Sequence, residues 1–188
     1  MEQQETICLA IAKIIRERSE IGKLIQFEEI LAELTRQGLQ KSEVADERFH
    51  FEAILREAVG KNGDLKEISS RDGGPFYYSS QSLSEAYVRI LIQKEENPLL
   101  LMAEIVRENS AIYPRPVPFD LFKESPFDLT QEEILECLKK MGKQVEYQDI
   151  SQTTTSIGTI FLYSKRHLDL GYASMLAEWL DVGQANNP

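Results

Sequence analysis

Apolar residues in the first sixty positions recur at helical spacing. A first helix is predicted from the stripe Ile7, Ile11, Ile14 and Ile15, and it ends before Gly22. A second helix is predicted from about Phe27 to Gln37 and is closed by Gly38. A third runs from a Ser42 cap to Val59, with Gly60 as its stop. The first part of the chain therefore reads as three consecutive helices.

The pattern then changes from helical spacing to alternation. Leu65 to Ser70 and Phe76 to Ser79 predict the two strands of a β-hairpin. A further amphipathic helix follows, opened by a capping box of Ser82 and Glu85. Its predicted apolar face consists of Leu83, Tyr87, Ile90 and Leu91.

The same order of elements is predicted in the second half. Asn97 and Pro98 suit the cap and first position of a helix, whose apolar face is Leu99, Met102, Ile105 and Val106. A short helix is predicted from about Pro118 to Lys123. The next helix opens with a Thr130/Glu133 capping box, continues through Ile134, Leu135 and Leu138, and closes at Gly142. A hairpin of Val145 to Ser151 and Ile157 to Tyr163, then a last amphipathic helix, complete this half.

Direct sequence matches support an internal duplication. Residues 12–21 and 103–112 are identical at six of ten positions, at an offset of 91 residues. Later matches keep the same order. They pair Ile25 with Val117, Phe27 with Phe119, Ile54-Leu55 with Ile134-Leu135, Ile68-Ser69 with Ile150-Ser151, and Tyr78-Ser79 with Tyr163-Ser164. We therefore interpret the chain as two copies of one unit.

Three helices followed by a hairpin resemble the winged-helix superfamily, in which a two-stranded wing follows a helix-turn-helix. The fold class implied is mostly α with small β-hairpins (α+β), arranged as tandem winged-helix domains joined by a helix. We expect a first domain at 1–81, a connecting helix at 82–96 and a second domain with a C-terminal amphipathic helix at 97–188. The additional short strand usual in this superfamily is only hinted at, by Leu24-Ile25 and Pro116-Val117.

The charge of the chain disfavours nucleic acid as a partner. The sequence carries 31 acidic and 21 basic side chains, a net charge of -10. The resemblance implies that the third helix of each unit would enter the major groove, but both helices carry more acidic than basic residues. Local exceptions are the candidate anion contacts Lys139, Lys140, Lys143, Lys165 and Arg166, which also suit a helix end and a strand edge.

The last helix carries the candidate partner-binding residues. Its apolar stripe contains the single tryptophan of the chain and consists of Tyr172, Met175, Leu176, Trp179 and Leu180. Such a stripe must pack on something, because burying each large side chain is worth about 1.5 to 3 kcal/mol. Packing on its own domain, on the helix of 82–96, on a partner protein and on a second copy of the chain all remain open.

No recognised pattern indicates catalysis. The glycines lack nucleotide-binding spacing, and His50 and His167 are too few for a three-histidine zinc site. His50 is interpreted as a half-buried structural histidine, and Cys8 and Cys137 as small buried hydrophobic residues. We expect no enzyme activity, no catalytic residue, no metal and no cofactor.

These observations predict a cytoplasmic, non-enzymatic adaptor that binds protein, or itself, through an apolar helix face. By fold and charge it resembles the protein-interaction subunits that bind kleisins in bacterial condensin-like complexes. The alternative is a winged-helix transcriptional regulator that binds DNA through a locally basic wing or after dimerisation. The N-terminus is acidic, and no segment approaches the ~20 apolar residues that span a membrane.

Overall fold

The computed structural model describes residues 2–39, 45–71 and 73–183, and the side chains among these except those of 2–3 and 45–49. Its described residues form seven α-helices and two small three-stranded antiparallel sheets, so the fold is mixed α and β. The chain divides into two compact units, Met1–Ile92 and Gln93–Pro188. The boundary between the units falls inside the helix α4 (Glu85–Glu96).

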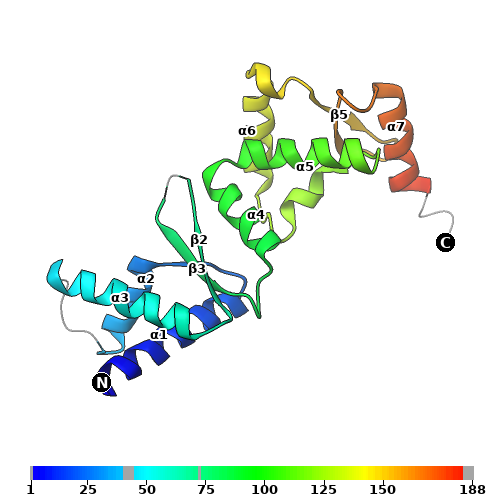
Figure 1. Ribbon diagram of the computed structural model, residues 1–188. Helices are drawn as coiled ribbons and strands as arrows, with labels where there is room; N and C mark the ends of the chain where they lie inside the picture. Colours follow the sequence, from blue (N-terminus) through cyan, green and yellow to red (C-terminus); the bar gives the residue numbers. More distant parts are fainter. Residues whose placement is uncertain (1, 40–44, 72, 184–188) are drawn as a thin grey trace. The chain divides into compact units, whose positions relative to one another are not determined.

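The first unit begins with helices and ends with a hairpin and α4 (Figure 1). Its elements are α1 (Glu2–Glu20), β1 (Ile25–Gln26), α2 (Phe27–Arg36), α3 (Ala45–Lys61), β2 (Leu65–Ser69), β3 (Pro75–Ser79) and α4 (Glu85–Glu96). The strand order is β1-β3-β2, so the short first strand pairs with the second strand of the hairpin. The core lies between α1, α2, α3 and the sheet, with Ile11, Ile15, Ile30 and Leu34 fully buried.

The second unit repeats this order of elements. They are α5 (Pro98–Ile112), β4 (Val117–Pro118), the 3-10 helix η1 (Phe119–Lys123), α6 (Gln131–Met141), the 3-10 turn η2 (Val145–Tyr147), β5 (Ile150–Thr154), β6 (Ile160–Ser164), α7 (Leu170–Glu178) and the π-helical turn η3 (Trp179–Gly183). The strand order, β4-β6-β5, matches that of the first unit. None of the helices in the described part of the chain is both long and apolar enough to cross a membrane.

Several local predictions are confirmed. Asn97 caps α5 by accepting a hydrogen bond from the backbone N–H of Leu100 at 3.0 Å. Thr130 and Glu133 form the predicted capping box of α6. Gly22 and Gly38 lie just beyond α1 and α2 with φ of 75° and 72°, which L side chains avoid. The hinted strands exist as β1 and β4.

Other local predictions are wrong. Gly60 lies inside α3 instead of stopping it. Val145 begins a 3-10 turn and not a strand, because the chain bends there to bury Tyr147. The cap of α4 is Ser84, whose Oγ accepts from the N–H of Tyr87, and not Ser82. His50 is exposed. The predicted cap Ser42 lies outside the described residues.

Sheet register and burial each correct one of the repeat matches. Leu65 pairs with Ser79 in the first hairpin, and Ile150 pairs with Ser164 in the second. Leu65 is thus the counterpart of Ile150, and the predicted match of Ile68-Ser69 with Ile150-Ser151 is shifted by three residues. The match of Ile54-Leu55 with Ile134-Leu135 is also wrong, because Leu55 is buried whereas Leu135 is 48% exposed.

Burial indicates the true correspondence of the third helices. In α3 the buried positions include Phe51, Ile54 and Ala58, and in α6 they are Ile134, Cys137 and Met141, with the same spacing. Cys137 therefore fills the place of Ile54 and is a small buried hydrophobic residue, as predicted. Cys8 is buried on α1, and burial raises the pKa of both thiols.

Candidate functional site

The α7 helix buries its small residues. Asp169 caps it by accepting a hydrogen bond from the N–H of Tyr172 at 3.0 Å. Ala173 and Ala177 are 0% and 1% exposed, and Ala173 packs with Tyr163 and Leu168. Alanine lets a helix backbone approach its support closely, and α7 lies directly against β5 (Figure 1). The side of α7 that packs on its own unit is therefore formed by small residues and not by the large apolar stripe.

The large apolar residues of α7 face outward. Tyr172, Met175 and Trp179 are 44%, 56% and 56% exposed, and Leu176 is half-buried between them and the alanines. At 3.6 residues per turn these four side chains span an arc of about 100°. We call this set, Tyr172, Met175, Leu176 and Trp179, the α7 apolar face. The second unit does not cover it, so packing within its own domain fails as an explanation of the stripe.

The remaining predicted stripe residue, Leu180, lies elsewhere. Like Trp179, the C-cap of α7, it belongs to η3, but it lines a pocket of about 400 Å³ beside the edge strand β4. The lining residues are Asn109, Arg115, Pro116, Val117, Pro118, Leu121, Thr159, Phe161, Leu180 and Asp181. The structure thus brings four of the five predicted partner-binding residues onto one surface and separates the fifth.

Polar contacts with the β5–β6 hairpin fix how α7 is rotated. The hydroxyls of Thr153 and Ser174 are 2.7 Å apart. Glu178 accepts hydrogen bonds from both the backbone N–H and the hydroxyl of Ser156, the first at 2.9 Å. Thr155 Oγ1 donates to Asp181 Oδ2 at 2.7 Å. These contacts hold the polar side of α7 and η3 on the hairpin, so the apolar face points away from it.

Negative charge lies at the start of α7 and on its hairpin side. From Leu168 to Gly183 the sequence contains Asp169, Glu178 and Asp181 but no lysine, arginine or histidine. The donors to Glu178 and Asp181 named above are neutral, and no ion pair in the described part of the chain includes either carboxylate. The last turn of α7 also lacks a basic residue, so the negative end of the helix dipole is uncompensated there.

A buried ionic network precedes α7. Arg107 donates to both carboxylate oxygens of Asp149, at 2.9 and 2.6 Å, and Ser164 Oγ donates to Asp149 at 2.8 Å. Hydrogen bonding to Arg107 lowers the pKa of Asp149 to about 2, against burial, which raises it. The carbonyl of Ser164 accepts from the N–H groups of His167 and Leu168, in the turn that enters α7.

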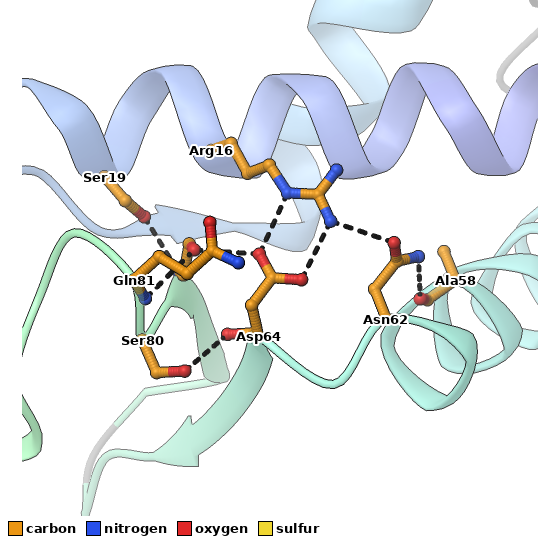
Figure 2. A network of polar contacts seen from close by, with 8 residues as sticks. Arg16, Ser19, Ala58, Asn62, Asp64, Ser80 and Gln81 are labelled. Atoms are coloured by element: carbon orange, nitrogen blue, oxygen red, sulfur yellow. Dashed lines mark hydrogen bonds and ion pairs between the residues drawn. The ribbon is translucent and has the colours of Figure 1, made fainter.

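The first unit contains the same network (Figure 2). Arg16 donates to Asp64 at 2.9 and 2.8 Å, and Ser79 Oγ donates to Asp64 at 2.9 Å. The pKa of Asp64 is likewise about 2, chiefly because of Arg16. In each unit a buried serine of the first helix, Ser19 or Ser110, accepts from the backbone N–H of Ser79 or Ser164. These arginines and serines match between the two repeats in the sequence, but their shared aspartate partner was not predicted.

The candidate anion contacts are partly engaged within the protein. Lys140 pairs with Glu136 at 2.8 Å on α6, and Arg166 pairs with Asp149 at 3.2 Å. The cluster of Lys139, Lys140 and Lys143 and the cluster of Lys165 and Arg166 thus bind separate carboxylates of the protein, Glu136 and Asp149. Lys139, Lys143 and Lys165 are exposed.

Most of the chain is similar to a known protein. Over 181 residues it is 30% identical to the uncharacterized protein YdhW of Escherichia coli (strain K12), and the matched region covers 95% of this chain and 80% of that relative. The chain belongs to the YdhW family. Residues 95–185 also match the family model described as the YdhW C-terminal domain. No solved structure matches the chain.

The limits of the YdhW C-terminal domain agree closely with those of the second unit. The matched segment starts two residues after the unit begins at Gln93. It contains the α7 apolar face, the network of Arg107 and Asp149 and the pocket beside β4. The candidate surface therefore lies wholly within the part of the chain that this YdhW model describes.

Proposed function

We propose that this YdhW-family chain is a non-enzymatic protein-interaction subunit built from two winged-helix units, which binds a partner protein through the α7 apolar face. The observation that carries the proposal is the exposure of Tyr172, Met175 and Trp179 on one face of a helix whose other face is packed. Exposed aromatic and methionine side chains on a rigid element are typical anchors of protein interfaces.

The winged-helix interpretation draws support from topology. Each unit has the order helix, strand, helix, helix and hairpin, and its first strand pairs with the second strand of the hairpin. In the second unit the place of the second helix is taken by the 3-10 helix η1. An added helix, α4 or α7, follows each hairpin. Since these added helices lie outside the three-helix core, they can serve association.

The energy available at the face is sufficient for a specific contact. Each of the three exposed side chains has about half of its surface still to bury. At about 1.5 to 3 kcal/mol for complete burial, each would contribute roughly 1 kcal/mol, and together about 3 kcal/mol. This corresponds to a factor of more than about 100 in affinity before any polar contact is counted.

A matched pair of variants tests the proposal. Met175→Ala with Trp179→Ala removes two anchors, whereas Leu135→Ala with Val145→Ala removes two other exposed apolar side chains of the same unit, 48% and 82% exposed. Each affinity-tagged chain is produced in its source cell, and co-purifying proteins are quantified. We expect the α7 pair to lose a partner that the control pair retains. Equal retention by both pairs contradicts the proposal, provided that circular dichroism shows both chains folded.

The DNA-binding alternative is separated by an electrophoretic titration of duplex DNA at low salt. The engagement of Lys140 and Arg166 with carboxylates speaks against it. We expect no shift of the duplex. A shift that weakens steeply with salt would favour a regulator over an adaptor.

A further inference from the structure

The pocket beside β4 can be compared with the equivalent place in the first unit, because the two sheets share one register. Ile25 on β1 pairs with Tyr77, and Val117 on β4 pairs with Leu162. Each partner lies two residues before the last residue of its strand. Ile25 and Val117 are therefore equivalent positions, and their neighbours can be matched one by one.

The residues next to these positions are covered in the first unit only. Leu24 and Pro116 come one residue earlier, and Phe76 and Phe161 are the equivalent residues of the paired strands. Leu24 and Phe76 pack against an apolar cluster to which α4 contributes. Pro116 and Phe161 instead line the pocket of about 400 Å³. The same framework is thus filled by the protein itself in one unit and open in the other.

The size of the side chains on the last helix of each unit accompanies this difference. Counted from the last residue of each hairpin, Val88 and Ile92 of α4 stand where α7 has Ala173 and Ala177. All four residues are buried. The valine and isoleucine belong to the cluster that covers Leu24, whereas α7 lies against β5 with its alanines and the space beside β4 stays open.

The open pocket has an apolar lining and two opposite charges. The apolar lining residues are Pro116, Val117, Pro118, Leu121, Phe161 and Leu180. Arg115 and Asp181 line the same pocket, yet within the described part of the chain no ion pair joins them or includes either one. The Arg115 guanidinium lies 5.2 Å from the ring centre of Tyr113. Thr155 donates to Asp181 Oδ2 at 2.7 Å, which leaves Oδ1 without a donor among the described residues.

We propose that this pocket binds a small zwitterion with an aliphatic body, which is a free amino acid such as leucine or a short peptide of such residues. Its carboxylate pairs with Arg115, its ammonium pairs with Asp181, and its aliphatic part lies on the apolar lining. The volume is within the range of about 300 to 1,000 Å³ that is usual for small-molecule sites. This site is separate from the α7 apolar face and goes beyond the proposed function.

The two charges favour a zwitterion over other occupants. A ligand with a carboxylate alone would be repelled by Asp181, and a ligand with an ammonium alone would be repelled by Arg115. A neutral ligand would cover both charges and leave them unpaired, which is costly. Addition of a β-strand along β4 is disfavoured, because Pro118 has no N–H to donate.

Calorimetric titration of the purified full chain tests the proposal. The probes are leucine and leucyl-leucine, each also as its C-terminal amide, which lacks the carboxylate, and as its N-acetyl form, which lacks the ammonium. We expect binding of a free zwitterion, with each blocked form at least about tenfold weaker, because a hydrogen bond to a charged group is lost. Whichever of leucine and leucyl-leucine binds more tightly identifies the ligand as an amino acid or a peptide.

Charge variants assign each end of the ligand to its residue. Arg115→Gln should weaken the zwitterion about tenfold and should not weaken the amide, which has no carboxylate to lose. Asp181→Asn keeps an oxygen for Thr155, and it should weaken the zwitterion but not the N-acetyl form. Lys143→Gln is the control, since Lys143 is an exposed cation of the same unit that does not line the pocket.

Three outcomes overturn the inference. They are binding of neither zwitterion at about 10 mM, equal affinity of the free and blocked forms, and an equal effect of Arg115→Gln and Lys143→Gln. The comparison of free and blocked probes uses the native chain, so it decides the matter even where a variant fails to fold. The proposed function is tested separately, by the variants of Met175 and Trp179.

Discussion

Replacing Asp149 by asparagine removes the charge at the centre of the network that precedes α7 and keeps the size of the side chain. The carboxylate is 8% exposed, and it binds Arg107, Arg166 and Ser164. Its pKa is about 2 in the folded chain against an ordinary value of 3.8. At 1.36 kcal/mol per pKa unit, this difference corresponds to about 2.5 kcal/mol of folding free energy at neutral pH.

The sign of the effect follows from the lowered pKa. A carboxyl group whose pKa falls on folding stabilises the protein fully above its unfolded value, and the contribution disappears as the pH falls through the folded value. We therefore expect Asp149→Asn to lose about 2.5 kcal/mol at pH 7, with the difference from the native chain shrinking between about pH 4 and pH 2.

Urea unfolding followed by the emission of Trp179 measures this loss in the second unit, since that unit holds the only tryptophan. The midpoint should fall by about 1 M or more, given a slope of about 1–3 kcal/mol/M. Asp64→Asn is the counterpart in the first unit and should cost a similar amount by circular dichroism. Glu136→Gln, at an exposed ion pair, is the control and should change nothing measurable. A loss from Asp149→Asn that is equal at pH 7 and pH 2 would refute the electrostatic reasoning.

Two further predictions concern packing and backbone conformation. Ala173→Leu should cost about 1–3 kcal/mol, because Ala173 is 0% exposed against Tyr163 and Leu168, and a thermal midpoint equal to the native one would contradict this packing. Gly38→Ala should cost about 1–2 kcal/mol because φ is 72° there, whereas Gly60→Ala inside α3 should gain about 0.5–1 kcal/mol. Effects of the same sign at both glycines in chemical denaturation would show that one of the two assignments is wrong.

Elements with strong local signals were predictable from the sequence. The start of α5 follows from an asparagine cap and a proline, and the start of α6 from a capping box, both of which act within four residues. The first hairpin was predicted within one residue because alternation and a glycine-rich turn are also local. Such signals do not depend on what the segment later packs against.

The orientation of α7 could not be predicted, because it depends on distant contacts. By hydrophobicity, Tyr172, Met175 and Trp179 suit a buried face better than two alanines do. Contacts with the β5–β6 hairpin set the opposite orientation. Thr155 and Ser156 donate hydrogen bonds to Asp181 and Glu178, and the alanine side of α7 lies close to β5. Exposure of the large residues is thus a property of the whole second unit.

The arginines and serines of the duplicated network could be matched from the sequence, but their aspartate partners could not. Arg16 and Arg107, and Ser19 and Ser110, are identical pairs within the ten-residue match. Identical polar residues within an apolar repeat are a signal for a shared buried partner. The partners Asp64 and Asp149 could not be paired with them, because the chain between arginine and aspartate differs in length, 48 positions in one unit and 42 in the other.

Quenching of Trp179 emission by acrylamide tests most directly whether the α7 apolar face is open. The purified chain, which has no other tryptophan, is compared with the same chain unfolded in urea. With Trp179 at 56% exposure, we expect long-wavelength emission and quenching at about half or more of the rate in the unfolded chain. Blue-shifted emission that acrylamide barely reaches would show that the face is already covered and would contradict its assignment as a free docking surface.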